Sequence, residues 1–442
     1  MSLMDPLDAF GTASARVLQQ VEDSVQRLSL NRRAFCKGLA EATALNNAQT
    51  MYQIDVGGVP FHTQTEVLHE GMLAAMSSEN FSNNLDHMFL DRDPTWFPLV
   101  LHFLRTGDAL LPECPEERRA VFREAQYYSL HGLCQAARKR PERIIVIGER
   151  YDGDYDDGGG DELLCEMFKP LHGSWEPIHV GAPAWGIPYN CNYSPGDTCL
   201  FVVQPRYHGG FHAGSVCRFS PATCSWVDIS SSNPLTVHAS SWAYHKDHLY
   251  GAAGTCLQSL DVSTGQWEEL PTQRSISQVH ISYASLCVVD DQLFVVGGLQ
   301  ASSFSSPVEY GNATTSVEAY LISERRCVSV PNMPTAVSGA AAVGLDGKLL
   351  VIGGVDIYGD ILSTVLEYNP ADQQWKRLPS LLLARTECTV TVLGGHVVVI
   401  GGYSWGEPLS SVERYNSRLH RWEAMHSLTD RLRCSAAVVI QV

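Results

Sequence analysis

The chain has 442 residues, 45% of which are hydrophobic, and a formal net charge of −17. A surface this acidic repels nucleic acid and anionic membranes, so neither is an expected partner. The sequence has no apolar run of about 18 residues, and its opening lacks the basic and apolar parts of a signal peptide; we therefore expect no membrane insertion and a cytoplasmic location.

The first region, residues 10–47, has no proline and a repeating apolar pattern. Its seam positions recur at alternating steps of three and four: Leu18, Val21, Val25, Leu28, Arg32, Phe35, Leu39 and Ala42. This spacing places one stripe along a helix. Two structures fit it, a short coiled coil and a single amphipathic helix docked on the next domain.

The second region, residues 50–138, has the pattern of an α+β domain. YQIDV and PFHT predict two short strands joined by a tight turn at Gly57 and Gly58. TQTE, from Thr63 to Glu66, fits a capping box and predicts that a helix begins there. The residues expected to form the buried face of this helix are Val67, Leu68, Met72, Leu73 and Met76.

Two further helices of this region are predicted to begin at prolines. A short strand ending at Leu90 precedes Asp93, the expected N-cap, and Pro94, the first helical position. Gly107 ends this helix, whose inward positions are Phe97, Val100, Leu101 and Leu104. The second helix starts at Pro115 and is expected to turn inward Val121, Phe122, Ala125 and Tyr128.

The runs VGGVPFHT, FLDRDPTWFPLVLHFLRTG and EAQYYSL resemble the T1-type BTB/POZ domain, the branch found in voltage-gated potassium channel tails and the KCTD proteins. The motif residues that stand at family spacing are Gly57, Gly58, Asp91, Arg92, Asp93, Pro94, Phe103, Arg105 and Gly107. The resemblance implies homo-oligomerisation through residues 50–138, helped by the N-terminal helix. Two departures leave the number of subunits open: Asp55 replaces the usual Asn, and residues 71–87 follow the family poorly.

The third region, residues 143–442, has no long helical pattern and repeats a β-rich unit. Paired glycines end three predicted strands: Gly297, Gly298, Gly353, Gly354, Gly401 and Gly402. A strand with an aromatic residue, a turn and a tryptophan follow later in five of the units. The tryptophans are Trp175, Trp226, Trp267, Trp375 and Trp422. One copy has Cys327 or Val328 at the tryptophan's place. These landmarks predict six units of about 50 residues.

The units resemble kelch repeats, the four-stranded blades of a β-propeller. The resemblance implies that the glycines end the second strand of a blade and that the tryptophan packs between blades. The first unit, RIIVIG, lacks an innermost strand, while RCSAAVVIQV is left over at the C-terminus. We infer that Cys434–Val442 supplies that strand and closes the ring. The expected fold is a helix or coiled coil, an α+β BTB/POZ domain and an all-β six-bladed kelch propeller.

No catalytic motif has the required spacing, so we expect a protein that is not an enzyme and that binds no cofactor. The thirteen cysteines match no metal-ligand spacing, which indicates free thiols in a reducing compartment. Some kelch propellers are copper oxidases that use histidine, tyrosine and cysteine. Tyr207, His208 and His212 lie in one loop, but their spacing does not specify copper.

In kelch propellers, the loops between the second and third strands of the blades and the segments that link successive blades commonly form the partner-binding face. The loops of the first group span residues 149–162, 205–214, 299–316, 355–363 and 403–410. Aromatic and arginine side chains on firmly held loops commonly anchor interfaces. The candidates are Asp154, Asp156, Arg206, Tyr207, Phe211, Phe304, Tyr310, Tyr358, Tyr403 and Trp405.

The first of these loops carries five aspartates and could suggest a calcium site. Neither EF-hand frame fits: from Asp152 the sixth and twelfth positions are Asp157 and Leu163, and from Asp154 the twelfth is Cys165. Solubility is the simpler interpretation of these aspartates. If the loop binds a partner, its charge favours a basic segment.

A T1-type BTB domain followed by a kelch propeller resembles the substrate adaptors of cullin-3 ubiquitin ligases. In that interpretation, the BTB domain oligomerises and binds the cullin, while the propeller captures an unknown protein substrate. Only RKRPERI separates the two domains, whereas animal BTB-kelch adaptors carry a helical BACK segment there. The same domain order resembles the malaria-parasite kelch protein, which implies the alternative of a non-ligase scaffold.

Overall fold

The computed structural model describes residues 51–77, 87–107, 109, 111–112, 114–139, 142–150, 163–170, 173–181, 192–203, 215–230, 241–253, 256–271, 280–301, 313–417 and 419–441. The expected helix at 10–47 lies outside these residues. The described chain forms two compact units: residues up to Arg105 with Glu124–His131, and Thr106–Arg123 with residues from Gly132 onward. No helix in this part of the chain is long and apolar enough to cross a membrane.

A three-stranded sheet organises the first unit, and it contains the expected hairpin. β1 (Met51–Val56) pairs antiparallel with β2 (Val59–Gln64), and β3 (His87–Leu90) joins β1 in parallel. Gly57 has a φ of 58°, and a Cβ there would lie 2.3 Å from the Arg92 carbonyl oxygen. Because only glycine fits this backbone and this approach, the turn depends on it.

The helix after the hairpin begins later than predicted. Thr63 belongs to β2, where it pairs with Tyr52, so it is extended and cannot cap a helix. A 3-10 turn, η1 (Thr65–Val67), follows, and α2 spans Gly71–Met76. The predicted capping box at Thr63–Glu66 is therefore wrong, because pairing in the hairpin takes up its first residue.

A distant backbone group sets the start of α2. The Met72 amide donates to the Tyr128 carbonyl oxygen at 2.8 Å, and a Cβ on Gly71 would lie 2.2 Å from the same oxygen. Of the five side chains expected to be buried, Leu68 and Leu73 are, whereas Val67, Met72 and Met76 are half-buried.

The next helix begins as predicted. The Asp93 carboxylate accepts the Thr95 amide at 2.9 Å, and Pro94 opens the 3-10 turn η2 (Pro94–Trp96). α3 (Phe97–Thr106) follows directly, and its four predicted inward residues are all buried. Gly107 ends it with a φ of 80°.

Two more helices precede the propeller. α4 (Pro115–Tyr127) begins at the predicted proline, and α5 (His131–Arg138) was not anticipated. Val121, Ala125 and Tyr128 are buried as predicted, whereas Phe122 is only half-buried, and the Arg138 guanidinium lies 4.8 Å from the centroid of its ring.

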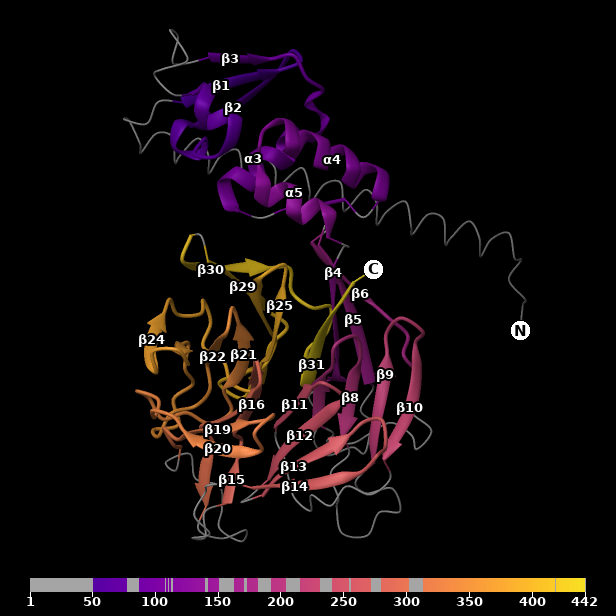
Figure 1. Cartoon of the computed structure of the whole chain (residues 1–442), viewed down its shortest axis with the longest axis vertical. Coiled ribbons are helices and arrows are strands. Elements are labelled where there is room, and N and C mark those ends of the chain that lie inside the picture. Colours follow the sequence, from indigo (N-terminus) through magenta and orange to yellow (C-terminus); the bar gives the residue numbers. More distant parts are fainter. Residues whose placement is uncertain are drawn as a thin grey trace, which may run out of the picture. The chain divides into compact units, whose positions relative to one another are not determined.

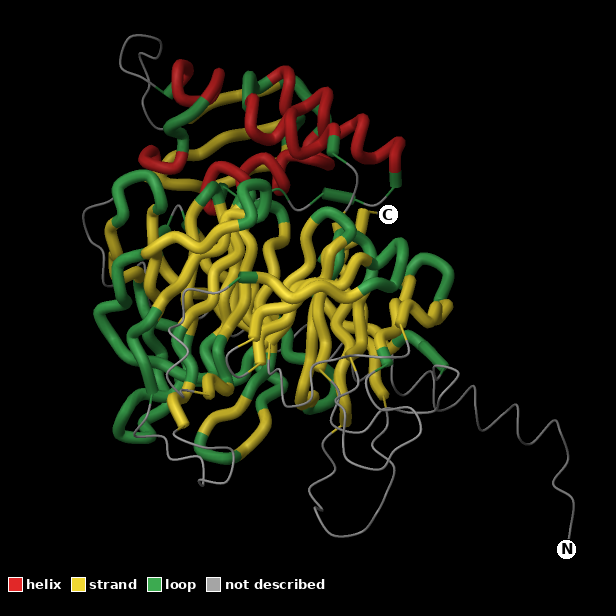
Figure 2. Tube along the Cα trace, turned by 60° about the horizontal axis from the view of Figure 1, so that its bottom comes forward, coloured by secondary structure: helices red, strands yellow, loops and turns green. Residues whose placement is uncertain are grey.

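Six antiparallel four-stranded sheets are the blades of the propeller (Figures 1 and 2). From the inner to the outer strand, blade one is β31 (Leu432–Gln441), β4 (Glu142–Arg150), β5 (Leu163–Lys169) and β6 (Ser174–Pro177). Blade two is β7 (Asn192–Pro195), β8 (Leu200–Val203), β9 (Val216–Ser220) and β10 (Ser225–Ser230). Blade three is β11 (Ser241–His245), β12 (His248–Ala253), β13 (Cys256–Asp261) and β14 (Trp267–Leu270).

Blade four is β16 (Ser285–Val289), β17 (Gln292–Val296), β19 (Val317–Leu321) and β20 (Arg326–Ser329). Blade five is β21 (Ala341–Leu345), β22 (Lys348–Ile352), β23 (Val365–Asn369) and β24 (Gln374–Leu378). Blade six is β25 (Thr389–Leu393), β26 (His396–Ile400), β29 (Val412–Asn416) and β30 (Arg421–Met425). Two short ladders pair β15 (His280–Ser282) with β18 (Leu299–Ala301) and β27 (Tyr403–Ser404) with β28 (Glu407–Pro408).

The C-terminal strand closes the ring as inferred from the sequence. β31 pairs antiparallel with β4 and is the innermost strand of blade one (Figure 1). The inner strands contact one another in a complete circle, β31 to β7, β11, β16, β21, β25 and back to β31. Closure removes the open sheet edge that a free blade would expose.

The core of the propeller lies between blades. One apolar cluster joins Ile144 and Trp175 of blade one to Val398 and Val412 of blade six. Another joins Leu350 of blade five to blade six. Each blade is thus stabilised mainly by its neighbours, and the loops at its ends rest on a fixed frame.

Candidate functional site

Most of the sequence-predicted partner-binding residues lie outside the described part of the chain. These are Asp154, Asp156, Arg206, Tyr207, Phe211, Phe304 and Tyr310, together with His208 and His212. Glu149 and Arg150, placed in the first loop by prediction, belong to β4 instead. The structure places the remaining three candidates, Tyr358, Tyr403 and Trp405, in the loops of blades five and six.

The paired glycines stand directly after the second strands of blades four, five and six, and all six have positive φ angles. Gly353 shows why: a Cβ there would lie 2.2 Å from the Arg385 carbonyl oxygen. The next amide, that of Gly354, donates to the same oxygen at 2.9 Å. The glycine pair therefore ties the exit of a second strand to the linker that leads to the next blade.

Tryptophans of the outer strands tie blades one, two, five and six to the blade that precedes each of them. Trp375 Nε1 donates to the Pro331 carbonyl oxygen at 2.9 Å, and Trp422 Nε1 to that of Pro379 at 2.8 Å. Trp175 and Trp226 donate to His426 and Val180 in the same way. Trp267 is half-buried and makes an edge-to-face contact with Trp242, at 6.2 Å between ring centroids.

Cys327, rather than Val328, takes the tryptophan's place in blade four. It pairs with Tyr320, as Trp375 pairs with Tyr368, and its Sγ donates to the Pro271 carbonyl oxygen at 3.1 Å. The smaller side chain thus keeps the bond to the preceding blade.

Four segments of blades five and six form one end of the propeller, and we call them the loop face. They are the loops 353–364 and 401–411 and the linkers 330–340 and 379–388. Backbone hydrogen bonds join them. Ser338 exchanges two bonds with Val355, at 2.9 and 2.8 Å, and Thr386 exchanges two with Tyr403, at 3.0 and 2.8 Å.

A further series of bonds runs across the blades. The Glu387 amide donates to the Gly339 carbonyl oxygen at 2.7 Å, and the Gly339 amide donates to that of Tyr283 at 2.9 Å. These residues precede the inner strands of blades six, five and four. The loop face therefore has a continuous hydrogen-bonded floor.

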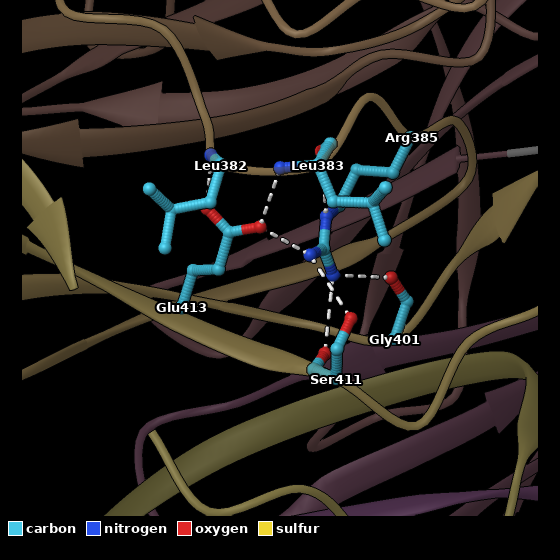
Figure 3. A network of polar contacts seen from close by, with 6 residues as sticks. All are labelled: Leu382, Leu383, Arg385, Gly401, Ser411 and Glu413. Carbon is cyan, nitrogen blue, oxygen red and sulfur yellow. Dashed lines mark hydrogen bonds and ion pairs between the residues drawn. The ribbon is translucent and has the colours of Figure 1, made fainter. Parts of the chain in front are cut away.

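A buried ion pair holds the second linker of the loop face in place (Figure 3). Arg385 is fully buried, and its Nη2 lies 2.5 Å from Oε1 of Glu413, which is 3% exposed. The Glu413 carboxylate also accepts the amides of Leu382 at 2.7 Å and Leu383 at 3.1 Å. The guanidinium donates further to the carbonyl oxygens of Gly401 and Ser411, at 2.9 and 3.1 Å.

This ion pair is well supplied with partners, as a buried pair must be to offset its desolvation. It fixes the path of residues 382–385 and leaves their apolar side chains outside. Sequence reasoning did not identify it, because Arg385 and Glu413 are 28 residues apart and belong to no motif.

Exposed apolar side chains gather on the loop face. Among the described propeller residues, eight large hydrophobic side chains are exposed: Val227, Tyr283, Ile357, Tyr358, Leu382, Leu383, Trp405 and Leu419. Five of these eight belong to the loop face, with Tyr358 at 81% and Trp405 at 77% exposure. Such a concentration marks an interaction surface better than isolated exposed residues do.

The three described candidates differ in how far their side chains are exposed. Tyr358 and Trp405 are exposed, but Tyr403 is half-buried because its backbone pairs with Thr386 and with Pro408 in the β27–β28 ladder. Leu382 and Leu383 were not named as candidates, although they belong to a run of three leucines in a segment that links two blades, and such segments are expected at the partner-binding face.

Glu387 is a second feature that was missed. Its side chain is exposed, yet the surrounding protein removes enough hydration to raise the pKa of its carboxyl group. It adopts a left-handed backbone, with a φ of 51°. Glu387 is equivalent to Gly339 and Tyr283 of the two preceding blades. This equivalence is visible only after the blades are aligned, so no local motif identifies Glu387.

The BTB motif residues are mainly structural in the described unit. Arg92 forms an ion pair with Glu124 and lies 4.2 Å above the Tyr127 ring. Arg105 donates to the His62 carbonyl oxygen at 2.9 Å, and Phe103 is buried. Asp91 is exposed.

The departure at Asp55 also has a structural use. Its Oδ1 accepts the Gly58 amide at 2.8 Å and so stabilises the hairpin turn. Outside the motif, Phe89 on the edge strand β3 is 60% exposed.

Within the described residues, no three histidine, cysteine, aspartate or glutamate side chains are grouped so that they could hold a metal ion.

Comparison with known protein families decides the architecture. The BTB/POZ domain model matches residues 52–137, and the kelch motif model matches residues 280–334, 336–382 and 384–429. The chain therefore has a BTB-kelch architecture, a BTB/POZ domain followed by kelch repeats. Its three matched kelch motifs correspond to blades four, five and six. BTB and kelch domains are typically non-enzymatic modules of protein interaction.

Several curated proteins are similar over part of their length. Kelch-like protein 23 of Homo sapiens is 26% identical over 287 residues, which cover 60% of this chain and 47% of that protein. Kelch-like protein 35 of Mus musculus is 23% identical over 350 residues, covering 75% and 55%. Alpha-scruin of Limulus polyphemus is 24% identical over 224 residues, covering 46% and 23%. The chain thus spans about half the length, or less, of these relatives.

A solved structure described as "Structure of YjhT" aligns with a TM-score of 0.48 and 13% sequence identity, over 60% of this chain and 91% of that one.

Proposed function

We propose that this BTB-kelch protein is a non-enzymatic, oligomeric adaptor of the cytoplasm. Its propeller recruits a protein substrate through the loop face, and its BTB domain joins copies of the chain and binds cullin-3. In this proposal the domains extend over residues 50–138 and 143–442, and residues 10–47 form a helix that assists oligomerisation. Two or more propellers on one base would raise the effective concentration of a shared target.

One observation supports the recruiting role most directly. Five of the eight exposed large hydrophobic side chains described in the propeller lie on the loop face, and that face is held by hydrogen bonds and a buried ion pair. Apolar anchors on a pre-organised surface bind with less loss of conformational entropy than anchors on loose loops do.

A scaffold that binds no cullin is the second candidate, and the spacing of the two domains favours it. α5 ends at Arg138 and β4 begins at Glu142, which leaves no room for a helical BACK segment between them. In animal BTB-kelch adaptors that segment helps to hold the cullin. The scaffold would use the same oligomeric base to array propellers.

Light scattering after gel filtration tests both candidates on the purified full chain. The adaptor predicts a mass that is a multiple of 48.6 kDa and that rises when the N-terminal domain of cullin-3 is added. The scaffold predicts the same multiple without a rise. A mass of one chain, with or without cullin-3, contradicts both.

A further inference from the structure

The loop face is acidic as well as apolar. Its four segments contain four carboxylates and one cationic side chain: Asp356, Asp360, Glu387, Glu407 and Arg385. Arg385 is fully buried against Glu413, so it offers no positive charge to a partner. The exposed charge of the face is therefore negative.

Two of these carboxylates are already engaged. Glu407 lies 3.4 Å from Arg431, and Asp356 accepts the amides of Tyr358 and Asp360 in its own loop, at 2.8 and 3.0 Å. The side chains of Asp360 and Glu387 have no hydrogen-bond or ion-pair partner among the described residues. They remain available for a cation from outside.

Glu387 stands at a position that favours glycine. Tyr283, Gly339 and Glu387 occupy equivalent positions in blades four, five and six, with φ angles of 55°, 61° and 51°. A left-handed backbone costs a residue other than glycine about 1–2 kcal/mol. Blade five has glycine at this position, whereas blade six has a glutamate there, which lowers the stability of the folded chain.

The backbone floor brings the carboxylate and the aromatic side chains to one surface. Glu387 follows Thr386, which is paired with Tyr403, and Trp405 lies two residues beyond Tyr403. On the other side, Glu387 is bonded to Gly339, the neighbour of Ser338, which is paired with Val355 in the loop of Tyr358.

We propose that the loop face binds a protein segment through an arginine side chain, whose guanidinium is received by Glu387 while apolar neighbours pack on Trp405 and Tyr358. This inference rests on the recruiting role proposed above and names the chemistry of what is recruited. Arginine fits better than lysine because its planar group both pairs with a carboxylate and stacks on aromatic rings. An anionic membrane or nucleic acid would be repelled.

The test is a selection from a phage library of random peptides on the immobilised full chain. Recovered sequences should be enriched in arginine relative to the unselected library. The strongest peptide, synthesised with a fluorescent label, should lose at least about tenfold in affinity for Trp405→Ala, the loss of an aromatic anchor. For Glu387→Gln, the loss should be about tenfold and should shrink in high salt.

Two control variants match these changes. Asp290→Asn removes an exposed carboxylate that also has a left-handed backbone, with a φ of 55°, in the turn between β16 and β17. Leu419→Ala removes an exposed apolar side chain from the turn between β29 and β30. Both turns lie at the ends of strands opposite the loop face, so neither variant should change the affinity.

The outcomes separate this inference from the function on which it rests. Peptides that are neutral or acidic, but still depend on Trp405, overturn the arginine preference and leave the recruiting role standing. Arginine-rich peptides that bind Glu387→Gln as well as the unchanged chain overturn the role of Glu387. Recovery of no peptide overturns the inference, and with a monomeric chain it overturns the proposed function too.

Discussion

Two junctions between blades each contain a buried glutamate that accepts backbone amides of the linker, but the surroundings of the two glutamates differ. Between blades five and six, Glu413 accepts the amides of Leu382 and Leu383 and pairs with Arg385. Between blades six and one, Glu166 accepts the amides of Thr429 and Asp430, at 3.0 and 3.2 Å. Leu432 stands there at the position of Arg385.

The difference shows which part of the arrangement is general. Two linker amides are enough to keep a carboxylate buried, since Glu166 is 1% exposed. The arginine adds bonds to Gly401 and Ser411, so it fixes the linker of blade six more firmly. That linker carries Leu382, Leu383 and Glu387 outward, whereas the other carries Asp430, which pairs with Arg150 at 3.1 Å.

The largest effect is expected from Glu413→Leu. It leaves Arg385 buried without its counter-charge and removes the acceptor of two amides, so the free energy of unfolding should fall by about 3–5 kcal/mol. Chemical denaturation of the propeller transition measures this. The double variant with Arg385→Leu should recover part of the loss, because the unpaired charge is gone; no recovery would contradict the account.

A smaller loss in the free energy of unfolding is expected from Arg385→Leu. This variant places a leucine at the junction of blades five and six, as Leu432 does at the junction of blades six and one. Glu413 keeps its two amide donors, as Glu166 does, so the loss should be about 2 kcal/mol, the value of a hydrogen bond to a charged group. The same denaturation experiment applies. A loss as large as that of Glu413→Leu would show that the two junctions are not equivalent.

The exposed pair at the other junction should matter little. The side chains of Arg150 and Asp430 are 43% and 37% exposed, and pairs of this kind contribute about 0–1 kcal/mol. Asp430→Asn keeps the backbone amide that donates to Glu166. A change in unfolding free energy above about 1 kcal/mol would show that this exposed pair helps to hold the junction together, which contradicts the prediction.

The smallest expected effect is a pH dependence at Glu387, whose counterpart at the other junction is Cys434. Loss of hydration to the surrounding protein raises the pKa of the Glu387 carboxyl above its ordinary value, so the folded state binds this proton more tightly than the unfolded chain. Stability then falls as the pH rises from the ordinary glutamate pKa through the raised one. Glu387→Gln removes this loss, so the advantage of the variant in melting temperature should grow across that window. An advantage that shrinks with rising pH would contradict the assignment.

Much of the fold was predictable because the propeller repeats its signals. Paired glycines such as Gly353 and Gly354 mark strand exits, and Trp375 marks the outer strand, so the six blades and the closing strand follow from the sequence. The start of α2 does not, because it depends on the carbonyl oxygen of Tyr128, far along the chain.

The candidate site was predictable only in part. Tyr358 and Trp405 are aromatic residues in loops, and their exposure follows from that position. Glu387, Leu382 and Leu383 lie in a linker, and their exposure depends on the ion pair of Arg385 and Glu413, which no local pattern reveals.

We expect the loop face of blades five and six to recruit a basic protein segment. The most direct test is the affinity of the selected arginine peptide for the full chain and for Glu387→Gln, with Asp290→Asn as the control. We expect the affinity to fall about tenfold for Glu387→Gln and to stay unchanged for the control. Equal affinity for all three proteins would contradict it.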